Sequence, residues 1–440
     1  MMRRSIHQAR QGTRSLSIAH PQLQWHPRAL PVAAARLHSL PYRSGLTKRP
    51  ELTDTLLRTG KPQARRFASS DSSAPLSKTP LYDLHLRHGG KMVPFGGVQH
   101  YFKGPGAQGL LEKLTPAGLA SLPNHQSTLS TFLHPGTGGI VDDTVITRIG
   151  PEAFYVVTNA ACRDKDLSYI GSSIDEWHSS NDGKVQWETL DGQGLIALQG
   201  PLSVEILEPL LEDAADANLK ETFFGQSKFL KVRLLSGKLT QPLLVSRGGY
   251  TGEDGFEISV PADETEGVVN ALLKTAGEDK LRLAGLGSRD SLRLEAGMCL
   301  YGHDLNDSTT PVEGGLSWVI GKDRRIGGGF NGAETVLRQL KPKKEGGGVD
   351  RRRIGLLVEG APAREGAVIV SPEGEEIGKV TSGCPSPSLK KNIAMGYIKT
   401  GFNKAGTEVA VVVRGKNRKA TVSKMPFLPS KYWKGGATPG

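Results

Sequence analysis

Cysteine is scarce in this sequence of 440 residues, which contains only Cys162, Cys299 and Cys384. The three are far apart, odd in number and without Cys-x-x-Cys spacing, so we expect reduced thiols and neither a disulfide framework nor a metal site. Long apolar runs are also missing, because no segment approaches the roughly 18 uninterrupted apolar residues of a membrane span. The sequence therefore favours a protein with no bound metal and no membrane association.

Acidic residues are missing from the first fifty positions. Residues 1–70 contain thirteen Arg and Lys residues but only two acids, Glu51 and Asp54, and so carry nearly all of the net charge of +12. The remaining chain is close to neutral, which argues against a nucleic-acid partner. Residues 1–70 lack the continuous apolar stretch of a secretory signal and are rich in Arg and Ser, which predicts a mitochondrial transit peptide rather than a basic cytosolic tail.

Strand and helix patterns mix without regular alternation between residues 79 and 340, which predicts an α+β domain rather than a doubly wound sheet. Alternating segments separated by Gly and Pro turns predict strands, and apolar residues at helical spacing predict helices. Asp263 and Glu266 have the spacing of a capping box at a helix start. The expected strands are 127–133, 140–149 and 153–158, and the expected helices are 201–212, 263–275 and 288–296.

A Lys- and Gly-rich linker at residues 341–348 leads into a C-terminal region. Six short strands at regular spacing occupy residues 350–433, which predicts a small all-β barrel or sandwich. The expected strands are 353–358, 367–370, 376–381, 393–398, 408–413 and 419–423.

The letters of a dinucleotide-binding loop, G-x-G-x-x-G, occur at residues 104–109. Only a brief apolar segment precedes them, and no acid follows at the end of a second strand, so the βαβ context of such a loop is missing. We interpret the segment as the start of a helix.

Two neighbouring carboxylates, Asp142 and Asp143, lie in the middle of an expected strand. Alternation puts them on opposite faces, and because both faces are apolar the pattern alone does not say which Asp points inward. A carboxylate buried in a cleft is a candidate for proton or charge chemistry. An Asp near a turn can equally well cap a loop N–H group, and the segment leaves both interpretations open.

An acidic turn at residues 250–255 precedes a strand on which Glu257 lies between two apolar residues. A carboxylate that faces an apolar layer is costly unless a partner satisfies it. A flat heterocycle with adjacent ring N–H and amino donors would be such a partner, since a carboxylate accepts two parallel hydrogen bonds. The alternative is a surface hairpin with solvated acids. Arg289 and Arg293 either belong to a solvated helix face or, in the case of Arg289, bind a ligand carboxylate.

Eight segments form a distinctive series when they are read in order. They are residues 79–85, 88–95, 139–143, 155–160, 250–259, 288–302, 310–314 and 381–391. In this order they resemble the aminomethyltransferase, or T-protein, family of the mitochondrial glycine cleavage system. The resemblance covers nearly all of residues 79–433, and the later segments are highly specific.

This resemblance implies a folate-binding aminomethyltransferase fold of α/β subdomains at residues 79–340, followed by a small β-barrel at residues 350–433. It implies tetrahydrofolate as the cosubstrate and the lipoylated H-protein as the partner, whose dihydrolipoyl arm carries the aminomethyl group. The products would be methylenetetrahydrofolate, ammonia and the reduced lipoyl carrier. The implied location is the mitochondrial matrix.

The resemblance also assigns site residues by their position in the family's segments. The catalytic Asp falls on Asp143, and the carboxylate that holds the pterin falls on Glu257. Arg289 and Tyr432 fall on residues that contact the substrate. A carboxylate beside the folate nitrogens suits the chemistry, because it can deprotonate or orient the attacking amine and stabilise developing positive charge.

The resemblance is interrupted after Gly97. In the family a further strand, helix and strand follow the glycine-rich segment, whereas in this chain Gly97 runs directly into Val98 and the helix start at residues 104–109. About thirty residues, one supersecondary unit, are missing. Two explanations compete. One is a mis-spliced or mis-predicted version of a normal enzyme, which the abrupt join favours, and the other is a catalytically impaired folate-binding isoform.

Two related classes fit less well. Dimethylglycine and sarcosine oxidases join a folate-binding domain to a flavin domain, for which this chain has no region. The folate-binding iron–sulfur assembly protein carries a Lys-Gly-Cys-x-Gly-Gln-Glu signature, whereas Cys384 is followed by Pro385. The T-protein family remains the first hypothesis.

Overall fold

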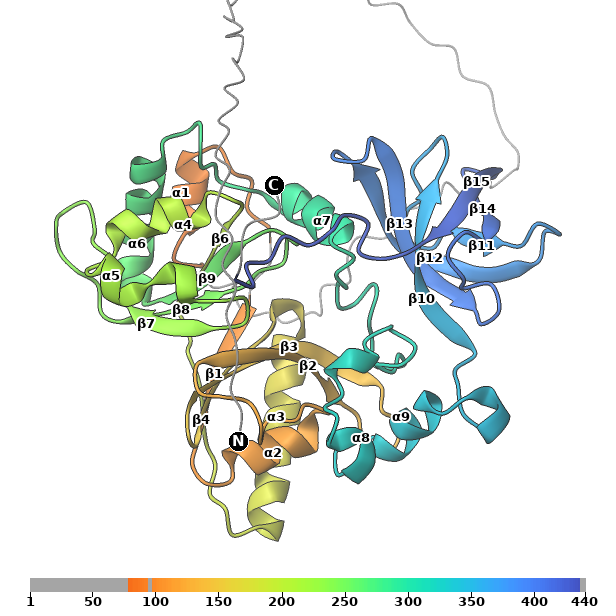
Figure 1. Ribbon diagram of the computed structural model, residues 1–440, viewed down its shortest axis with the longest axis horizontal. Helices are drawn as coiled ribbons and strands as arrows, with labels where there is room; N and C mark the ends of the chain where they lie inside the picture. The colour runs from red at the N-terminus through yellow and green to blue at the C-terminus, as the bar shows by residue number, and fades with distance from the viewer. Residues whose placement is uncertain (1–77, 94–96, 436–440) are drawn as a thin grey trace, which may run out of the picture. The chain divides into compact units, whose positions relative to one another are not determined.

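The computed structural model describes residues 78–93 and 97–435, so the predicted transit peptide at residues 1–70 lies outside the described residues. All described residues lie in the unit formed by residues 73–440. They form two sheets with flanking helices and a separate closed barrel (Figure 1). In the described part of the chain, no helix is both long and apolar enough to cross a membrane.

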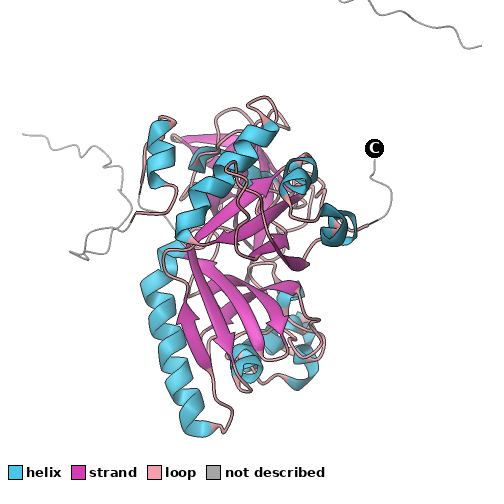
Figure 2. Cartoon of the chain, turned by 90° about the vertical axis from the view of Figure 1, so that its left-hand side faces the viewer, coloured by secondary structure: helices cyan, strands magenta, loops and turns pink. Residues whose placement is uncertain are grey.

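A five-stranded antiparallel sheet with two helices forms the first layer. Its elements are β1 (Gly97–Lys103), α2 (Ala107–Leu114), β2 (Gln126–Leu133), β3 (Ile140–Gly150), β4 (Ala153–Asn159), α3 (Arg163–Ser180) and β5 (Gln186–Thr189). The strand order is β2-β3-β4-β1-β5, and the long helix α3 runs beside the strands (Figure 2). Phe102, Phe154 and Ile170 are fully buried between the sheet and its helices, and burial of each such side chain contributes about 1.5–3 kcal/mol.

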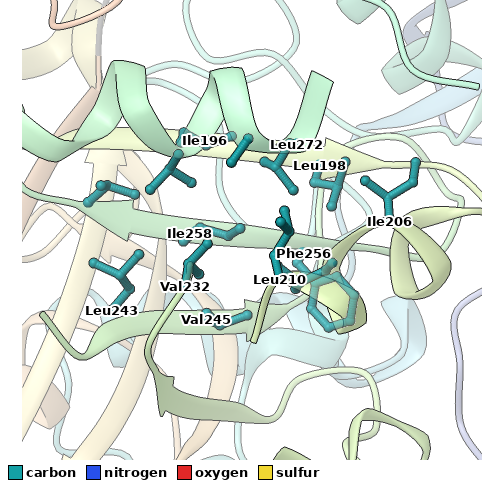
Figure 3. Packing of buried hydrophobic residues seen from close by; sticks show 14 of the residues in the cluster. Ile196, Leu198, Ile206, Leu210, Val232, Leu243, Val245, Phe256, Ile258 and Leu272 are labelled. Atoms are coloured by element: carbon teal, nitrogen blue, oxygen red, sulfur yellow. The ribbon is translucent and has the colours of Figure 1, made fainter. Parts of the chain in front are cut away.

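A four-stranded sheet in the order β6-β9-β8-β7 forms the second layer. The strands are β6 (Gly194–Gln199), β7 (Ser227–Leu230), β8 (Leu243–Arg247) and β9 (Gly255–Val260), and the helices are α1 (Tyr82–Arg87), α4 (Ser203–Leu207), α5 (Ala214–Ala217) and α6 (Ala262–Ala276). Ile258 and Phe256 of β9 pack with Leu272 of α6 in one apolar cluster (Figure 3). This cluster fixes which face of β9 points away from the helices.

The C-terminal strands close into a barrel in the order β10-β13-β12-β11-β14-β15, which confirms the predicted small β-barrel. They are β10 (Arg351–Val358), β11 (Val368–Val370), β12 (Glu376–Ser386), β13 (Lys391–Lys399), β14 (Glu408–Val413) and β15 (Lys416–Ser423). Along the chain, the segment between the second sheet and the barrel contains the helices α7 (Leu286–Glu295), α8 (Arg324–Gly327) and α9 (Ala333–Leu340).

Buried charges on α7 connect this helix to the barrel strand β12. The Arg293 guanidinium donates to Asp304 at 2.6 Å and to the Ser382 hydroxyl at 2.9 Å. Two residues later, the Glu295 carboxylate accepts hydrogen bonds from the Ser386 hydroxyl at 2.5 Å and from the Ser388 backbone N–H at 3.1 Å. Arg293 is therefore a structural residue, and the interpretation of this Arg as part of a solvated helix face is wrong.

Some predicted elements are confirmed and two details are wrong. The three strands of the meander are β2, β3 and β4, and residues 104–109 do lead into the helix α2. The helix expected at residues 201–212 is wrong in extent, because α4 ends before Pro209, which lacks the N–H that would continue it. The capping box is also wrong, since α6 begins after Pro261 without any side-chain cap.

Candidate active site

The two sheets face each other across a small cavity of about 20 Å³. A polar contact joins the two sheets, because Gln99 of β1 accepts a hydrogen bond from Ser259 on β9 at 2.6 Å. Within the first sheet, Gln99 also accepts one from Tyr155 on β4 at 2.7 Å. The first sheet lines the cavity with Val145, Thr147, Tyr155 and Val157, and the second with Leu195, Leu244, Ser246, Glu257 and Ser259. Of the candidate site residues, Glu257 lines this cavity.

The two neighbouring carboxylates of β3 lie directly after a β-bulge and point to opposite faces of the sheet. Phe132 pairs with Asp142 and the next residue of β2 pairs with Ile140, so Val141 is an extra residue in β3. After the bulge, alternation resumes, and Asp143 shares the face of Val145, which lines the cavity. Asp142 lies on the opposite face, fully buried toward α3.

Asn159, at the end of β4, connects the two carboxylates. Its side-chain Nδ2 donates to Asp142 Oδ1 at 3.0 Å and to Asp143 Oδ1 at 2.9 Å. Its backbone N–H donates to Asp142 Oδ2 at 2.8 Å. Asn159 belongs to a segment that carries the family resemblance, but nothing in the residue pattern assigns it a role.

The environment of Asp143 favours its neutral form more than water does. Burial raises the pKa of Asp143 to about 7, and the neighbouring charge of Asp142 acts in the same direction. The hydrogen bond from Asn159 opposes this shift without cancelling it. A carboxyl group that titrates near neutral pH is suited to accept and release a proton.

Glu257 points from β9 into the space between the sheets. Its neighbours Phe256 and Ile258 are buried in the cluster on the other face, and Glu257 itself lines the cavity. Burial raises the pKa of Glu257, and the charge of Arg289 acts against this rise. A carboxylate with little water around it forms strong hydrogen bonds to N–H donors that approach it.

Arg289 and Tyr250 complete the surroundings of the two acids. The guanidinium carbon of Arg289 lies 4.7 Å from the centroid of the Tyr250 ring, and Arg289 is an exposed residue. Tyr250 is close enough to Asp143 for that charge to raise its pKa, although burial is the larger cause. The structure thus brings Asp143, Glu257 and Arg289 into one region with Tyr250 among them.

The acids of the glycine-rich turn have structural partners. Asp254 accepts two hydrogen bonds from the buried Arg247 guanidinium, at 2.9 and 2.5 Å. Glu253 forms an ion pair with Lys431 at 3.1 Å. Gly252 adopts φ +74°, where a side chain would be strained and would press on Ala296. The interpretation of these acids as solvated is therefore wrong for Asp254.

Tyr432 lies next to this turn on the C-terminal segment. Its ring stacks on Phe224 with 4.0 Å between centroids, and the neighbouring Lys431 N–H donates to the Gly252 carbonyl at 2.8 Å. Among the described residues, no hydrogen bond links Tyr432 to Asp143, Glu257 or Arg289. The structure therefore brings three of the four predicted site residues together and places the fourth beside the turn that carries Tyr250.

Within residues 78–93 and 97–435, no group of three or more His, Cys, Asp or Glu side chains has an arrangement that could hold a metal ion. The three cysteines are free and buried.

Comparisons with known proteins point in one direction. The chain matches the family "GCVT N-terminal domain" over residues 92–324 and the family "Glycine cleavage T-protein C-terminal barrel domain" over residues 351–428. It is similar to the mitochondrial aminomethyltransferase of Solanum tuberosum, with 43% identity over 415 positions that cover 85% of this chain and 98% of the relative. The mitochondrial aminomethyltransferase of Mus musculus is also 43% identical, over 81% of this chain and 91% of that protein.

A solved structure is similar in fold as well as in sequence. It is the crystal structure of glycine cleavage system aminomethyltransferase T from Bartonella henselae. The similarity has a TM-score of 0.70 at 32% identity and covers 82% of this chain and all of that one.

Proposed function

Since the chain belongs to the aminomethyltransferase family of glycine cleavage T-proteins, we propose that its catalytic site lies where the two sheets meet, with Asp143 as the catalytic residue. The enzyme transfers the one-carbon unit of an aminomethyl group to tetrahydrofolate and releases ammonia. The observation that carries the proposed site is that Glu257 lines the small cavity from the second sheet, while Asp143 lies on the face of β3 whose Val145 lines it from the first. Residues 79–340 form the catalytic domain of the proposal, and residues 350–433 form its barrel domain.

Asp143 acts on the attacking amine of tetrahydrofolate. Because its pKa is raised toward neutral pH, its carboxylate accepts a proton from this amine more readily than an ordinary Asp would. The same carboxylate stabilises the positive charge that develops on the one-carbon unit during transfer. Asn159 keeps Asp143 Oδ1 in a fixed position for both tasks.

Glu257 binds the flat ring of the folate. Its carboxylate offers two acceptor oxygens, which match the adjacent ring N–H and exocyclic amino donors of a pterin. Because burial raises the pKa of Glu257, part of the cost of keeping it charged is recovered only when such donors are bound. This gives the site a preference for a ligand with paired donors.

Arg289 and Tyr432 contact the remainder of the substrate. The exposed guanidinium of Arg289 is available to a ligand carboxylate, and Tyr250 supports it from one side. Tyr432 lies on the segment that is attached to the turn at Gly252, so its ring can line the approach to the site. The proposed partner is the lipoylated H-protein, and the proposed location is the mitochondrial matrix.

The substitution Asp143→Asn tests this proposal. In an assay of folate-dependent ammonia release from aminomethyl-loaded H-protein, we expect kcat to fall by about 10²–10⁴-fold, which is the usual contribution of a positioned acid or base. The Kd for tetrahydrofolate, measured by calorimetry, should change little because Asp143 does not hold the ring. The matched control is Asp175→Asn, an exposed Asp on α3.

Two results would contradict the assignment. If folate affinity and turnover fell by the same factor, Asp143 would be a binding residue. If the variant kept full turnover, the catalytic role would belong to another group. A wild-type chain that binds tetrahydrofolate but releases no ammonia would instead support the impaired folate binder.

A further inference from the structure

Asp166, in the first turn of α3, is a buried acid that the proposed reaction does not use. Its side chain is 0% exposed, and within the described part of the chain neither carboxyl oxygen has a hydrogen-bond donor in good geometry. An ionised carboxylate in such a place would be very costly. A neutral carboxyl group avoids this cost and gains an O–H donor of its own.

The acceptor for this donor is Asp142, whose carboxyl group lies beside Asp166. The two acids differ in their other contacts. Asp142 Oδ1 and Oδ2 each accept an N–H of Asn159, at 3.0 and 2.8 Å. Donors of this kind favour the charged form, so Asp142 is the ionised member of the pair and Asp166 holds the proton. Burial raises the pKa of both acids, but the hydrogen bonds from Asn159 lower that of Asp142, whereas the charge of Asp142 raises that of Asp166 further.

Among the other groups near the pair, Lys165 carries a charge that lowers the pKa of Asp166, but burial and the charge of Asp142 have larger effects and raise it. The Thr158 hydroxyl lies beside Asp166, and the Cys162 thiol lies beside Asp142, where burial raises its pKa and keeps it neutral. Lys165, the neighbour of Asp166, is drawn outward by Asp307 at 3.3 Å. Lys165 also lies over the ring of Tyr301, 4.2 Å from its centroid.

We propose that Asp166 is a positioning residue that remains protonated and donates to the Asp142 carboxylate, which in turn holds Asn159 against Asp143. The inference rests on the proposed role of Asp143 and extends it to a chain of four residues from α3, β3 and β4. The Asp142 charge has two effects in this arrangement. It fixes the Asn159 amide, and as a like charge it keeps the pKa of Asp143 high.

A pair of isosteric variants separates the two acids. In Asp166→Asn, the amide replaces the O–H as a neutral donor, so we expect kcat within about twofold of wild type and an unchanged pH profile, because no charge is altered. In Asp142→Asn, the anchoring charge is lost, and we expect kcat to fall about tenfold or more. The acidic limb of its pH profile should move to lower pH, since Asp143 no longer has a like charge beside it.

The assay is ammonia release as a function of pH, with Asp175→Asn as the surface control and thermal melting to confirm that each variant is folded. If Asp166→Asn were as impaired as Asp142→Asn, or the more impaired of the two, Asp166 would not be the neutral donor and the inference would be wrong. Normal activity and normal pH profiles in both variants would show that Asp142 and Asp166 only fill space, and the inference would be wrong.

A third variant, Asp166→Leu, fills the same space without a donor. It should lose turnover while tetrahydrofolate affinity is retained, and full turnover in a folded Asp166→Leu protein would overturn the inference. Asp143→Asn is measured alongside. If that variant is active, the proposed function of Asp143 fails, whereas an inactive Asp143→Asn with a harmless Asp142→Asn contradicts only the role of Asp166 and Asp142.

Discussion

At the scale of single residues, Glu257 shows how a binding group can reduce the stability of its own fold. Its folded-state pKa is raised, so the native state binds a proton more tightly than the unfolded state. The free energy of unfolding therefore falls as pH rises from the ordinary Glu pKa through the raised one. Above that pH window the ionised Glu257 carboxylate lowers the stability of the free protein. It interacts favourably only when a ligand with N–H donors is bound.

Because the Glu257 charge lowers stability but favours ligand binding, Glu257→Gln should change the two properties in opposite directions. An amide offers one acceptor where the carboxylate offers two, and we expect tetrahydrofolate affinity to fall by about 1.5–3 kcal/mol, the value of hydrogen bonds to a charged group. The free protein should be as stable as wild type or more stable at pH 8, because no charge is buried. Calorimetric titration and thermal melts measure the two effects.

The control for this prediction is Glu253→Gln, whose carboxylate pairs with Lys431 at the surface of the same turn. Little change in either measurement is expected there. If Glu257→Gln bound tetrahydrofolate as tightly as wild type, the ring would be held by another group.

At the scale of elements, the buried network between α7 and β12 should matter more for stability than any surface ion pair. Asp304 is fully buried and accepts hydrogen bonds from Arg293 at 2.6 Å and from Ser382 at 3.0 Å. Asp304→Ala leaves the Arg293 charge without its main partner, which typically costs about 3–5 kcal/mol. Urea unfolding should show this loss. The matched substitution Asp350→Ala removes an exposed pair with Lys343 and should cost less than about 1 kcal/mol.

The losses of unfolding free energy in Asp304→Ala and Asp350→Ala test this prediction when they are compared. Equal, small losses would mean that the α7 network contributes no more than the surface pair. A large loss confined to Asp304→Ala would identify the network as the main connection between the helix and the barrel.

The elements also show what the sequence could and could not predict. The strands of the meander and of the barrel alternate clearly, so their existence followed from the pattern, although β12 extends to Ser386 through its pairing with β13. The helix α3 was missed because it is largely polar and buries only Asp166, Ile170 and Ile174. The direction of Asp143 depends on which face of β3 packs on the second sheet, the face that carries Val145, and no local pattern records this.

The sequence predicts the residues of the candidate site more fully than the residues that position them. Asp143, Glu257 and Arg289 came from the family resemblance, and the fold brings them together from two sheets and a helix. Asn159 and Asp166 were not assigned roles, because their importance arises from contacts between residues of different elements. An acid on a polar helix looks solvated until the sheet beneath it is known.

At the scale of the whole molecule, the join at Gly97 lies close to the proposed site. Gly97 is the first residue of β1, and it pairs with Asn159, which holds Asp143. The missing unit of about thirty residues after Gly97 stays a prediction. A segment inserted after Gly97 would enter the fold beside Asn159 and hence close to the proposed catalytic residue Asp143.

We therefore predict that the cDNA across the codons for Gly97 and Val98 contains an insertion of about thirty codons, one supersecondary unit. The protein with this insertion should bind tetrahydrofolate more tightly and melt at a higher temperature than the 440-residue chain. The reason is that the cost of omitting a packed strand and helix is comparable to the whole stability of a domain, about 5–15 kcal/mol. Sequencing the transcript and melting both proteins with and without folate are the measurements. A transcript without the insertion would contradict the first part of this prediction. If the 440-residue chain also equalled the longer form in melting temperature and folate affinity, the unit would be dispensable, and the two sheets would form the site without it.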